Sequence, residues 1–255
     1  MSRIISVINQ KGGAGKTTTA AALGAGLHGS GERVLLIDLD TGNLSRDLNG
    51  EQSGAALEVL QSSAVMPEQI QRTPYGDLIA ADAMTATAEA VLINPGAEMH
   101  LREALEPIRA AYDYIIIDTP PTLGRRVTNA LTASDYVIIP TEATPHDLAG
   151  TGQLFEIIRA VQRYTNKGLQ VLGVLITNYE GRGKLQQGYR ETAEAMAEAV
   201  GSDLFPDPIP HGTDIQKAQA RQISIFEQAP RSKPAKAYSA LQKEVIRRIE
   251  KIEKR

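Results

Sequence analysis

The chain has 255 residues, which suits one large α/β domain and is too short for two ordinary domains with a linker, so we expect a single domain over residues 1–255. Its composition, 42% hydrophobic and 22% charged, excludes a disordered protein, and the absence of cysteine excludes disulfides, thiolate metal sites and iron–sulfur clusters. The net charge of −3 conceals a basic C-terminal end, because residues 231–255 contain nine Lys or Arg and three Glu. This excess of positive charge indicates either a face that binds a polyanion or a solvated helix end.

Short apolar runs rich in β-branched residues alternate along the chain with segments of helical spacing. The runs typical of strands span residues 3–8, 33–38, 77–82, 112–119, 135–141 and 169–178. The helical segments span residues 17–29, 148–165 and 185–200. Several strands are apolar throughout, as strands covered on both faces must be, so the alternation predicts a doubly wound α/β fold with a mostly parallel sheet flanked by helices. Residues 42–73 are polar and predict only short helices and loops.

The sequence INQKGGAGKTT at residues 8–18 nearly matches the phosphate-binding pattern G-x-x-x-x-G-K-[ST]. The G-K-T end is in place, but Gln10 stands where the first glycine belongs and is followed by an extra lysine, Lys11. A predicted strand precedes the loop and a predicted helix follows it, which is the context that such a loop needs. Backbone N–H groups here can converge on phosphate oxygens, helped by the positive end of the helix and by glycines that allow positive φ. The phosphate-binding residues expected on this basis are Gly12, Gly13, Ala14, Gly15, Lys16 and Thr17.

The same pattern indicates how the loop and a metal ion would share the charge of a nucleotide. Lys16 can reach the β- and γ-phosphates, and the Thr17 hydroxyl can ligate Mg²⁺. The metal also needs a carboxylate at the end of a neighbouring strand, and Asp118 lies at the end of such an apolar run. A lone aspartate at a strand end is otherwise a turn or cap residue, but beside this loop we expect Asp118 to act on Mg²⁺ through its water shell, as a Walker B aspartate does.

Four segments of the chain together resemble the ParA/Soj group of deviant Walker A ATPases, which partition plasmids and chromosomes. They are QKGGAGKTT, LLIDLD, IIIDTPP and the C-terminal IPHGTDIQKAQARQISIFEQAPRSKPAKAYSALQKEV, and the resemblance extends over nearly the whole chain. It implies ATP and Mg²⁺ as cofactors and a homodimer that encloses ATP between its subunits. It also implies that Lys11 contacts the phosphates bound by the other subunit, which would explain the second lysine of the loop.

The resemblance assigns further roles to residues around the loop. Asp40 would position the attacking water and Asp38 would belong to the metal shell, with a solvated acidic turn as the alternative for both. Thr18 would contact the α-phosphate, and Asn178 and Pro210 would line the adenine pocket. One departure is the sequence DLDTGN, which is one residue shorter than the D-x-D-P-Q-G-N of relatives. The backbone after Asp40, and with it the rate of hydrolysis, is therefore expected to differ.

Two segments hold basic residues that are candidates for contacts with DNA. Arg182 and Lys184 match a segment that bears DNA-contacting residues in partition ATPases. Relatives often place an arginine shortly after the I-P dipeptide, where this chain has Asp214, so Lys217 and Arg221 close by are the further candidates. The function implied is that of a cytoplasmic, nucleoid-associated partition ATPase. Its ATP-bound dimer would hold nonspecific double-stranded DNA until a ParB-like centromere-binding partner stimulates hydrolysis.

Two other functions stay open on the same fold. A MinD-like ATPase that cycles on membranes shares both lysines but needs an amphipathic C-terminal helix, and a small-molecule ligase or kinase would be stimulated by a metabolite instead of DNA. The final helix has an apolar stripe without Phe or Trp near its end, which favours a core or partner face over a membrane anchor. We find no signal peptide and no apolar run that approaches the ~20 residues of a membrane span, so no membrane partner is expected. The stripe consists of Tyr238, Leu241, Val245, Ile249 and Ile252.

Overall fold

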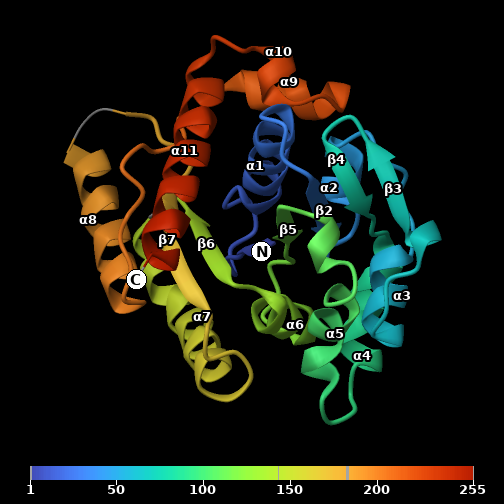
Figure 1. The fold of residues 1–255 in the computed structure, drawn as a ribbon. Helices are drawn as coiled ribbons and strands as arrows, with labels where there is room; N and C mark the ends of the chain where they lie inside the picture. The colour runs from blue at the N-terminus through green and yellow to red at the C-terminus, as the bar shows by residue number, and fades with distance from the viewer. Residues whose placement is uncertain (1, 143, 182–183, 255) are drawn as a thin grey trace.

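The structure is a computed structural model that describes residues 2–142, 144–181 and 184–254, with the side chains of residues 145–150 and 184–186 outside the description. Its centre is a seven-stranded sheet of order β3-β4-β2-β5-β1-β6-β7 (Figure 1). Parallel pairing joins β1 (Arg3–Val7), β2 (Val34–Asp38), β4 (Gly76–Ile79), β5 (Tyr114–Asp118), β6 (Tyr136–Thr141) and β7 (Gln170–Ile176). The remaining strand, β3 (Ile70–Thr73), pairs antiparallel with β4. The prediction of a mostly parallel α/β sheet is confirmed.

Helices cover both faces of the sheet, and the three predicted helices form close to their predicted bounds. The longer helices are α1 (Lys16–Gly29), α3 (Ala55–Ser62), α6 (Arg125–Ala133), α7 (Pro145–Tyr164), α8 (Lys184–Ala199), α9 (Thr213–Arg221) and α11 (Lys233–Glu253). The shorter ones are α2 (Asn43–Asp47), α4 (Ala88–Val91), α5 (His100–Leu105) and α10 (Ile225–Gln228). Turns of 3₁₀ helix are η1 (Pro67–Gln69), η2 (Ala83–Thr87), η3 (Ala97–Met99) and η4 (Arg109–Ala111).

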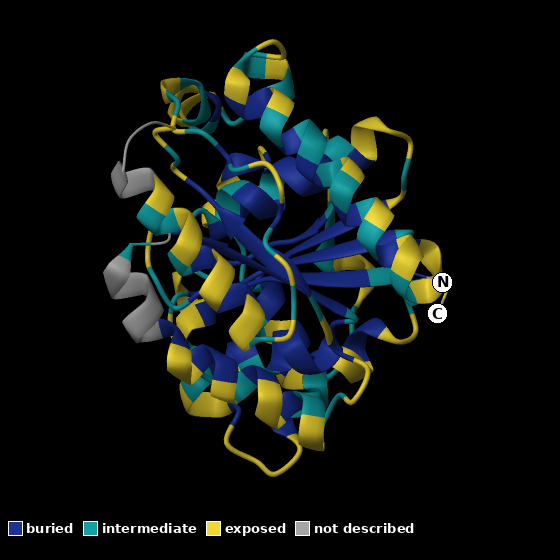
Figure 2. Cartoon of the chain, turned by 90° about the vertical axis from the view of Figure 1, so that its left-hand side faces the viewer, coloured by how far each residue is buried: buried dark blue, intermediate teal, exposed yellow. Residues whose placement is uncertain are grey.

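Alternate side chains of the central strands enter different cores. In β1, Ile5 packs in the cluster that contains the apolar side chains of α1 and α11, whereas Ile4 packs with those of α3 and α5 on the other face. In β5, Ile116 and Ile115 divide in the same way. Figure 2 shows the strands buried between helices whose outer sides are exposed. The strand sequences are apolar throughout because both of their faces are covered.

The edge strand β3 is the part of the sheet that the sequence does not predict. Residues 42–73 are expected to form only short helices and loops, which is wrong for the last four, because all residues of β3 are at least partly exposed and its sequence IQRT has no apolar pattern. A tight turn returns the chain to β4. In this turn Thr73 Oγ1 donates to the Gly76 carbonyl at 2.7 Å, and Gly76 has a φ of 120°, which favours glycine.

The last helix, α11, packs against α1 with its apolar stripe in the core. Tyr238, Leu241, Val245 and Ile249 are each at most 3% exposed, and Ile252 packs partly buried against the same cluster. Of the two alternatives expected for this stripe, a core face or a partner face, the structure shows the core face. Among the helices that the structure describes, none combines the length and the hydropathy needed to cross a membrane.

Candidate nucleotide-binding site

Three parallel strands end side by side beneath the glycine loop. β1 ends at Val7, which lies opposite Asp118 of β5, and Asp118 lies opposite Asp38 of β2. Because the carboxyl ends of parallel strands meet at one edge of a sheet, the loop after β1 and both aspartates share that edge. The structure thus brings together the phosphate-loop candidates and the strand-end carboxylates that the sequence predicts for one site.

The loop between β1 and α1 has a backbone that depends on its glycines. Gly13 and Gly15 have φ of 79° and 83°, in the left-handed region, whereas Gly12 is outside that region. Thr177, which follows β7, donates from Oγ1 to the Ala14 carbonyl at 2.9 Å, and a Cβ added to Gly15 would lie 3.2 Å from Thr177 Cγ2. The first turn of α1 contains no acidic residue. This helix N-terminus can therefore receive an anion without competition from a carboxylate of its own turn.

The Lys16 side chain lies inside the loop and away from solvent. It is 6% exposed, and its Nζ donates a hydrogen bond to the carbonyl oxygen of Lys11 at 3.2 Å. Burial lowers the pKa of Lys16, while the negative charges of Asp118 and Asp40 act in the opposite direction. An anionic ligand in the loop would add a compensating charge beside this buried ammonium.

Thr17 and Asp118 form the part of the site that fits a metal ion. The Thr17 hydroxyl donates to Asp118 Oδ2 at 2.7 Å, and the fully buried Asp118 keeps its Oδ1 without a hydrogen-bond partner among the described residues. Burial and the charge of Asp38 raise the pKa of Asp118 well above its ordinary value. A hydroxyl beside an unpaired carboxylate oxygen suits Mg²⁺, which prefers oxygen ligands. The described part of the chain contains no group of three or more His, Cys, Asp or Glu that could hold a metal ion.

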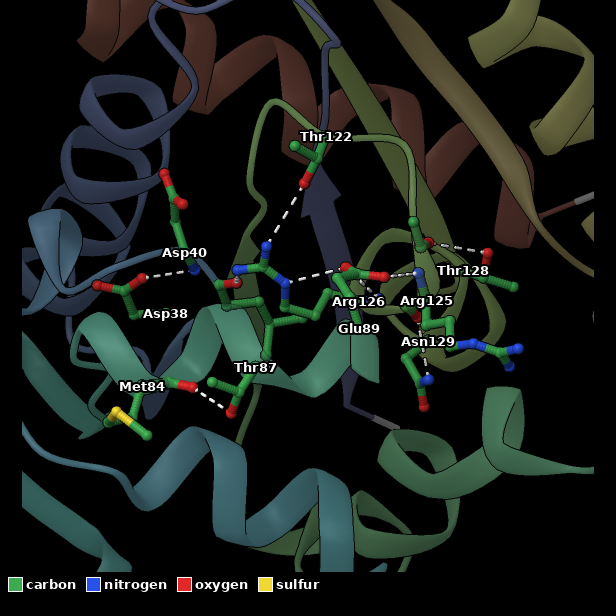
Figure 3. Close-up of polar contacts among 12 residues, drawn as sticks. Asp38, Asp40, Met84, Thr87, Glu89, Thr122, Arg125, Arg126, Thr128 and Asn129 are labelled. Carbon is green, nitrogen blue, oxygen red and sulfur yellow. Dashed lines mark hydrogen bonds and ion pairs between the residues drawn. The ribbon is translucent and has the colours of Figure 1, made fainter. Parts of the chain in front are cut away.

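Asp38 and Asp40 have different surroundings although one residue separates them (Figure 3). Asp38 is fully buried, and its Oδ2 accepts hydrogen bonds from both the backbone N–H and the hydroxyl of Ser45 at 2.9 Å. Its Oδ1 accepts the Asp40 backbone N–H at 2.9 Å, and burial raises the pKa of Asp38. The Asp40 carboxylate points away from Asp38 in this view. Asp38 therefore stabilises the turn that leads into α2. The Asp40 carboxylate points elsewhere, and its negative charge is close enough to Lys16 to counteract part of the lowering of the Lys16 pKa by burial.

Lys11 is held at the other side of the loop by a residue that the sequence does not predict. Its Nζ lies 2.5 Å from Glu142 Oε2, and Glu142 Oε1 accepts a hydrogen bond from Asn178 Nδ2 at 2.9 Å. Asn178 Oδ1 is in turn 2.8 Å from Nδ1 of His211. The two candidates for the adenine pocket are neighbours, because Tyr179 bridges to Pro210 directly after Asn178. Glu142 follows the last residue of β6, and that position at a strand end is the signal that could have identified it.

Thr18, the candidate for the α-phosphate, contacts helix α9. Gln219 of α9 lies with its Nε2 3.4 Å from Thr18 Oγ1 and donates to Asp47 Oδ2 at 3.0 Å. Asp47 ends α2, is 8% exposed, and has its pKa raised by burial. One glutamine therefore joins the first turn of α1, the helix after Asp40 and α9.

The candidates for DNA contacts fall partly on α9. Lys217 is well exposed there and pairs with Asp214 at 3.3 Å, and Arg221 ends the helix. Arg182 lies outside the described residues. Lys184 begins α8, but its side chain also lies outside the description. The structure places Lys217 and Arg221 on the helix that contacts the nucleotide-loop helix through its glutamine.

These features define a P-loop nucleotide-binding protein. They are a strand, a glycine loop and a following helix, together with a lysine, a threonine and a strand-end aspartate. A family model described as AAA domain matches residues 2–171. The sporulation initiation inhibitor protein Soj of Bacillus subtilis is 37% identical over 252 residues, which cover 96% of this chain and 98% of Soj. The chromosome partitioning protein ParA of Myxococcus xanthus is 34% identical over 253 residues, which cover 96% of this chain and 88% of ParA.

Among solved structures, cobyrinic acid a,c-diamide synthase of Mycobacterium smegmatis with bound ADP and magnesium superposes with a TM-score of 0.81 at 34% identity, over 98% of this chain and 96% of that one. The chain therefore belongs to this AAA-domain family and is a P-loop ATPase of the ParA/Soj type. The resemblance to the ParA/Soj group is confirmed.

Proposed function

We propose that this chain is a DNA-partitioning ATPase that binds Mg·ATP, dimerises around it, and holds double-stranded DNA without sequence preference until hydrolysis releases it. The observation that carries the ATP-dependent dimer in this proposal is the pair of lysines in one loop. Lys16 is enclosed by the loop, while the Lys11 side chain lies at the surface with 35% of its area exposed. In this proposal Lys16 serves the nucleotide of its own subunit, and Lys11 contacts the phosphates of a second subunit. The partitioning role of the ParA relative supports this proposal.

In this proposal the chain's own residues divide the work of hydrolysis. Thr17 would ligate Mg²⁺, Asp118 would act on the ion through its water shell, and Asp38 would belong to the metal shell. The bound ion supplies neutralisation of the charge on the β- and γ-phosphates. Lys16 binds the same phosphates, and Asp40 orients the attacking water. The loop residues 12–17 bind phosphate oxygens through their backbone.

The base and the α-phosphate of ATP have separate candidates. Thr18 meets the α-phosphate, and Asn178 and Pro210 line the adenine pocket. The hydrogen bond from Asn178 Nδ2 to Glu142 supports this assignment, since a side-chain amide already oriented at this edge can exchange its partner for a base. The whole of residues 1–255 acts as a single ATPase domain in this proposal.

DNA contacts come from α9 and from the start of α8. We assign the DNA contacts to Lys217 and Arg221, together with Arg182 and Lys184. The contact of Gln219 with Thr18 supports a link between this face and the nucleotide. A ParB-like centromere-binding partner would stimulate hydrolysis, so the ATPase would be associated with the nucleoid while ATP is bound.

The deciding experiment is a fluorescence anisotropy titration of duplex DNA with the protein in Mg·ATP and in Mg·ADP, at several salt concentrations. If each subunit of the dimer neutralises ~3 phosphates, the slope of log affinity against log salt is about −5 in ATP, and ADP gives weak binding. Two unrelated DNA sequences should bind equally. Equal binding in both nucleotides, or none in either, contradicts the DNA-partitioning function.

A small-molecule enzyme is the second candidate, because the Mycobacterium smegmatis structure that superposes on this chain is an amide synthase. The two functions differ in what accelerates ATP turnover. DNA and a ParB-like protein should do so for a partition ATPase, and a carboxylic acid substrate with an amide nitrogen donor should do so for an amide synthase. A membrane-cycling function has less support, since the apolar stripe of α11 that would serve as an anchor is in the core.

A further inference from the structure

A buried arginine lies at the edge of the sheet where Asp38 and Asp40 follow β2. Arg126, in the first turn of α6, is 4% exposed, and its Nη1 donates a hydrogen bond to the carbonyl oxygen of Leu39 at 2.9 Å. Leu39 is the residue between the two aspartates, and Figure 3 shows the guanidinium group beside the backbone there. The arginine therefore holds the peptide that leads directly into Asp40.

Glu89 of α4 fixes the orientation of this arginine. Its Oε1 lies 3.1 Å from Arg126 Nε, and its Oε2 accepts the backbone N–H of Arg125 at 2.6 Å (Figure 3). The carboxylate thus also caps the N-terminus of α6, where a negative charge is favourable. A Cβ on Gly124 would lie 2.2 Å from Glu89 Oε2, so a larger residue at this position would displace the carboxylate.

A third contact joins the arginine to the segment that follows β5. Arg126 Nη2 lies 3.4 Å from Thr122 Oγ1, and Thr122 belongs to the short connection between Asp118 and α6. One planar guanidinium group therefore spans the backbone before Asp40 and the connection after Asp118. A guanidinium group restricts its partners more than an ammonium group does, because its N–H donors are fixed in one plane.

We propose that Arg126 is a positioning residue for ATP hydrolysis, which fixes the Leu39 carbonyl and thereby the direction of the Asp40 carboxylate. The inference rests on the proposed role of Asp40 in orienting water. Stability alone is a weak reason for a charge here, because buried ion pairs are often no more stabilising than apolar side chains of similar volume. Arg126 contacts the segments that follow two strands, β2 and β5, at the same time. This explains why a guanidinium group, which has several directed donors, is found at this position.

The test compares Arg126→Met with Arg125→Met, the exposed arginine next to it. Arg126→Met should lower kcat by about 10- to 100-fold, the size of effect expected from a small displacement of a catalytic group, while the Kd for ATP and ATP-dependent dimerisation stay close to wild type. Arg126→Lys keeps the charge without the planar fork and should recover only part of kcat. Arg125→Met should behave as wild type. A loss of ATP affinity in parallel with kcat, or an unchanged kcat, overturns the proposal.

The double variant Asp40→Ala with Arg126→Met shows whether the arginine acts through Asp40. If it does, the double variant hydrolyses ATP no more slowly than Asp40→Ala alone, whereas fully additive losses overturn the proposal. If Asp40→Ala hydrolyses ATP at the wild-type rate, the catalytic role proposed for Asp40 is wrong, and this inference is wrong with it. If Asp40→Ala hydrolyses ATP slowly but Arg126→Met hydrolyses it at the wild-type rate, only the role of Arg126 is overturned.

Glu89→Gln provides a milder variant if Arg126→Met does not fold. The exchange keeps Arg126 but removes the charge that holds the guanidinium group toward the Leu39 carbonyl, so this bond is weakened. It should lower kcat by less than Arg126→Met would and leave ATP binding unchanged. A kcat equal to wild type in a folded Glu89→Gln protein overturns the proposal.

Discussion

Asp118→Asn is expected to stabilise the nucleotide-free protein while removing its response to Mg²⁺. The carboxyl group is fully buried with one oxygen unpaired among the described residues, and the repulsion from Asp38 exceeds the attraction from Lys16. Asparagine also leaves one buried atom without a partner, so the expected gain comes from removing the extra cost of burying a charge, on the order of 1–3 kcal/mol. Asparagine can still accept the hydrogen bond from Thr17, so the exchange removes the charge and keeps this contact. At about 2–4 °C per kcal/mol for a domain of this size, Tm without nucleotide should rise by about 2–12 °C.

The gain should depend on pH in a defined direction. Because the folded-state pKa of Asp118 is raised above 3.8, folding favours the protonated carboxyl group, and ionisation destabilises the wild type as pH rises from 3.8 through the folded-state pKa. The advantage of Asp118→Asn should therefore vanish in acid, increase over this interval, and stay constant above it. Thermal unfolding in a series of buffers measures the difference directly.

The assay is a set of thermal unfolding curves without nucleotide, with ATP alone, and with ATP and Mg²⁺. Wild type should gain stability from ATP and a further increment from Mg²⁺, since a ligand at 100 times its Kd contributes about 2.7 kcal/mol. Asp118→Asn should lose most of the Mg²⁺ increment, and Asp118→Ala, which also loses the Thr17 contact, should be less stable than Asp118→Asn. A lower Tm for Asp118→Asn than for wild type without nucleotide, or a full Mg²⁺ increment, would refute the reasoning.

Three further results are expected. Lys16→Ala should weaken ATP binding itself. Lys11→Ala should keep ATP binding but lose ATP-dependent dimerisation, as measured by light scattering. A dimer that still forms in Lys11→Ala would contradict a role of Lys11 across the subunits. Asp40→Ala should bind ATP and dimerise but turn over ~10²–10⁴ times more slowly, and turnover near wild type would assign the water to another residue. The double variant Lys217→Ala and Arg221→Ala should weaken binding to all DNA sequences equally and reduce the salt slope of the dimer by about 3–4, and an unchanged slope would exclude α9 from the DNA face.

The nucleotide loop and its aspartates could be predicted because they depend on local order and on one property of parallel sheets. A strand, glycines and a helix in succession place Lys16 and Thr17 at a helix N-terminus. The parallel pairing then places Asp38 and Asp118 at the same edge, whatever the intervening segments do. These predictions needed no knowledge of how α3, α4 or α5 pack.

The contacts that hold the site together could not be predicted, since they join distant residues without a sequence pattern. Arg126 reaches Leu39 across 87 positions, and Glu89 reaches Arg126 across 37. Periodicity identifies which face of a helix is apolar, but it does not identify which polar side chains of two helices will meet. The edge strand β3 was missed for a related reason, because a strand that is partly exposed along its length has no apolar alternation to detect.

The ion pair between Lys11 and Glu142 sets a condition on any role of Lys11 across a dimer. In this structure the Lys11 ammonium is bound within its own subunit, so it must exchange Glu142 for phosphate oxygens before it can serve a partner. The exchange is inexpensive, because the two side chains are 35% and 26% exposed and such pairs contribute about 0–1 kcal/mol. Glu142 also holds Asn178, so an adenine that binds the Asn178 amide would remove one of the bonds that orient this carboxylate. Occupancy of the base pocket would then loosen Lys11 in the same subunit, which connects recognition of the base with readiness to dimerise.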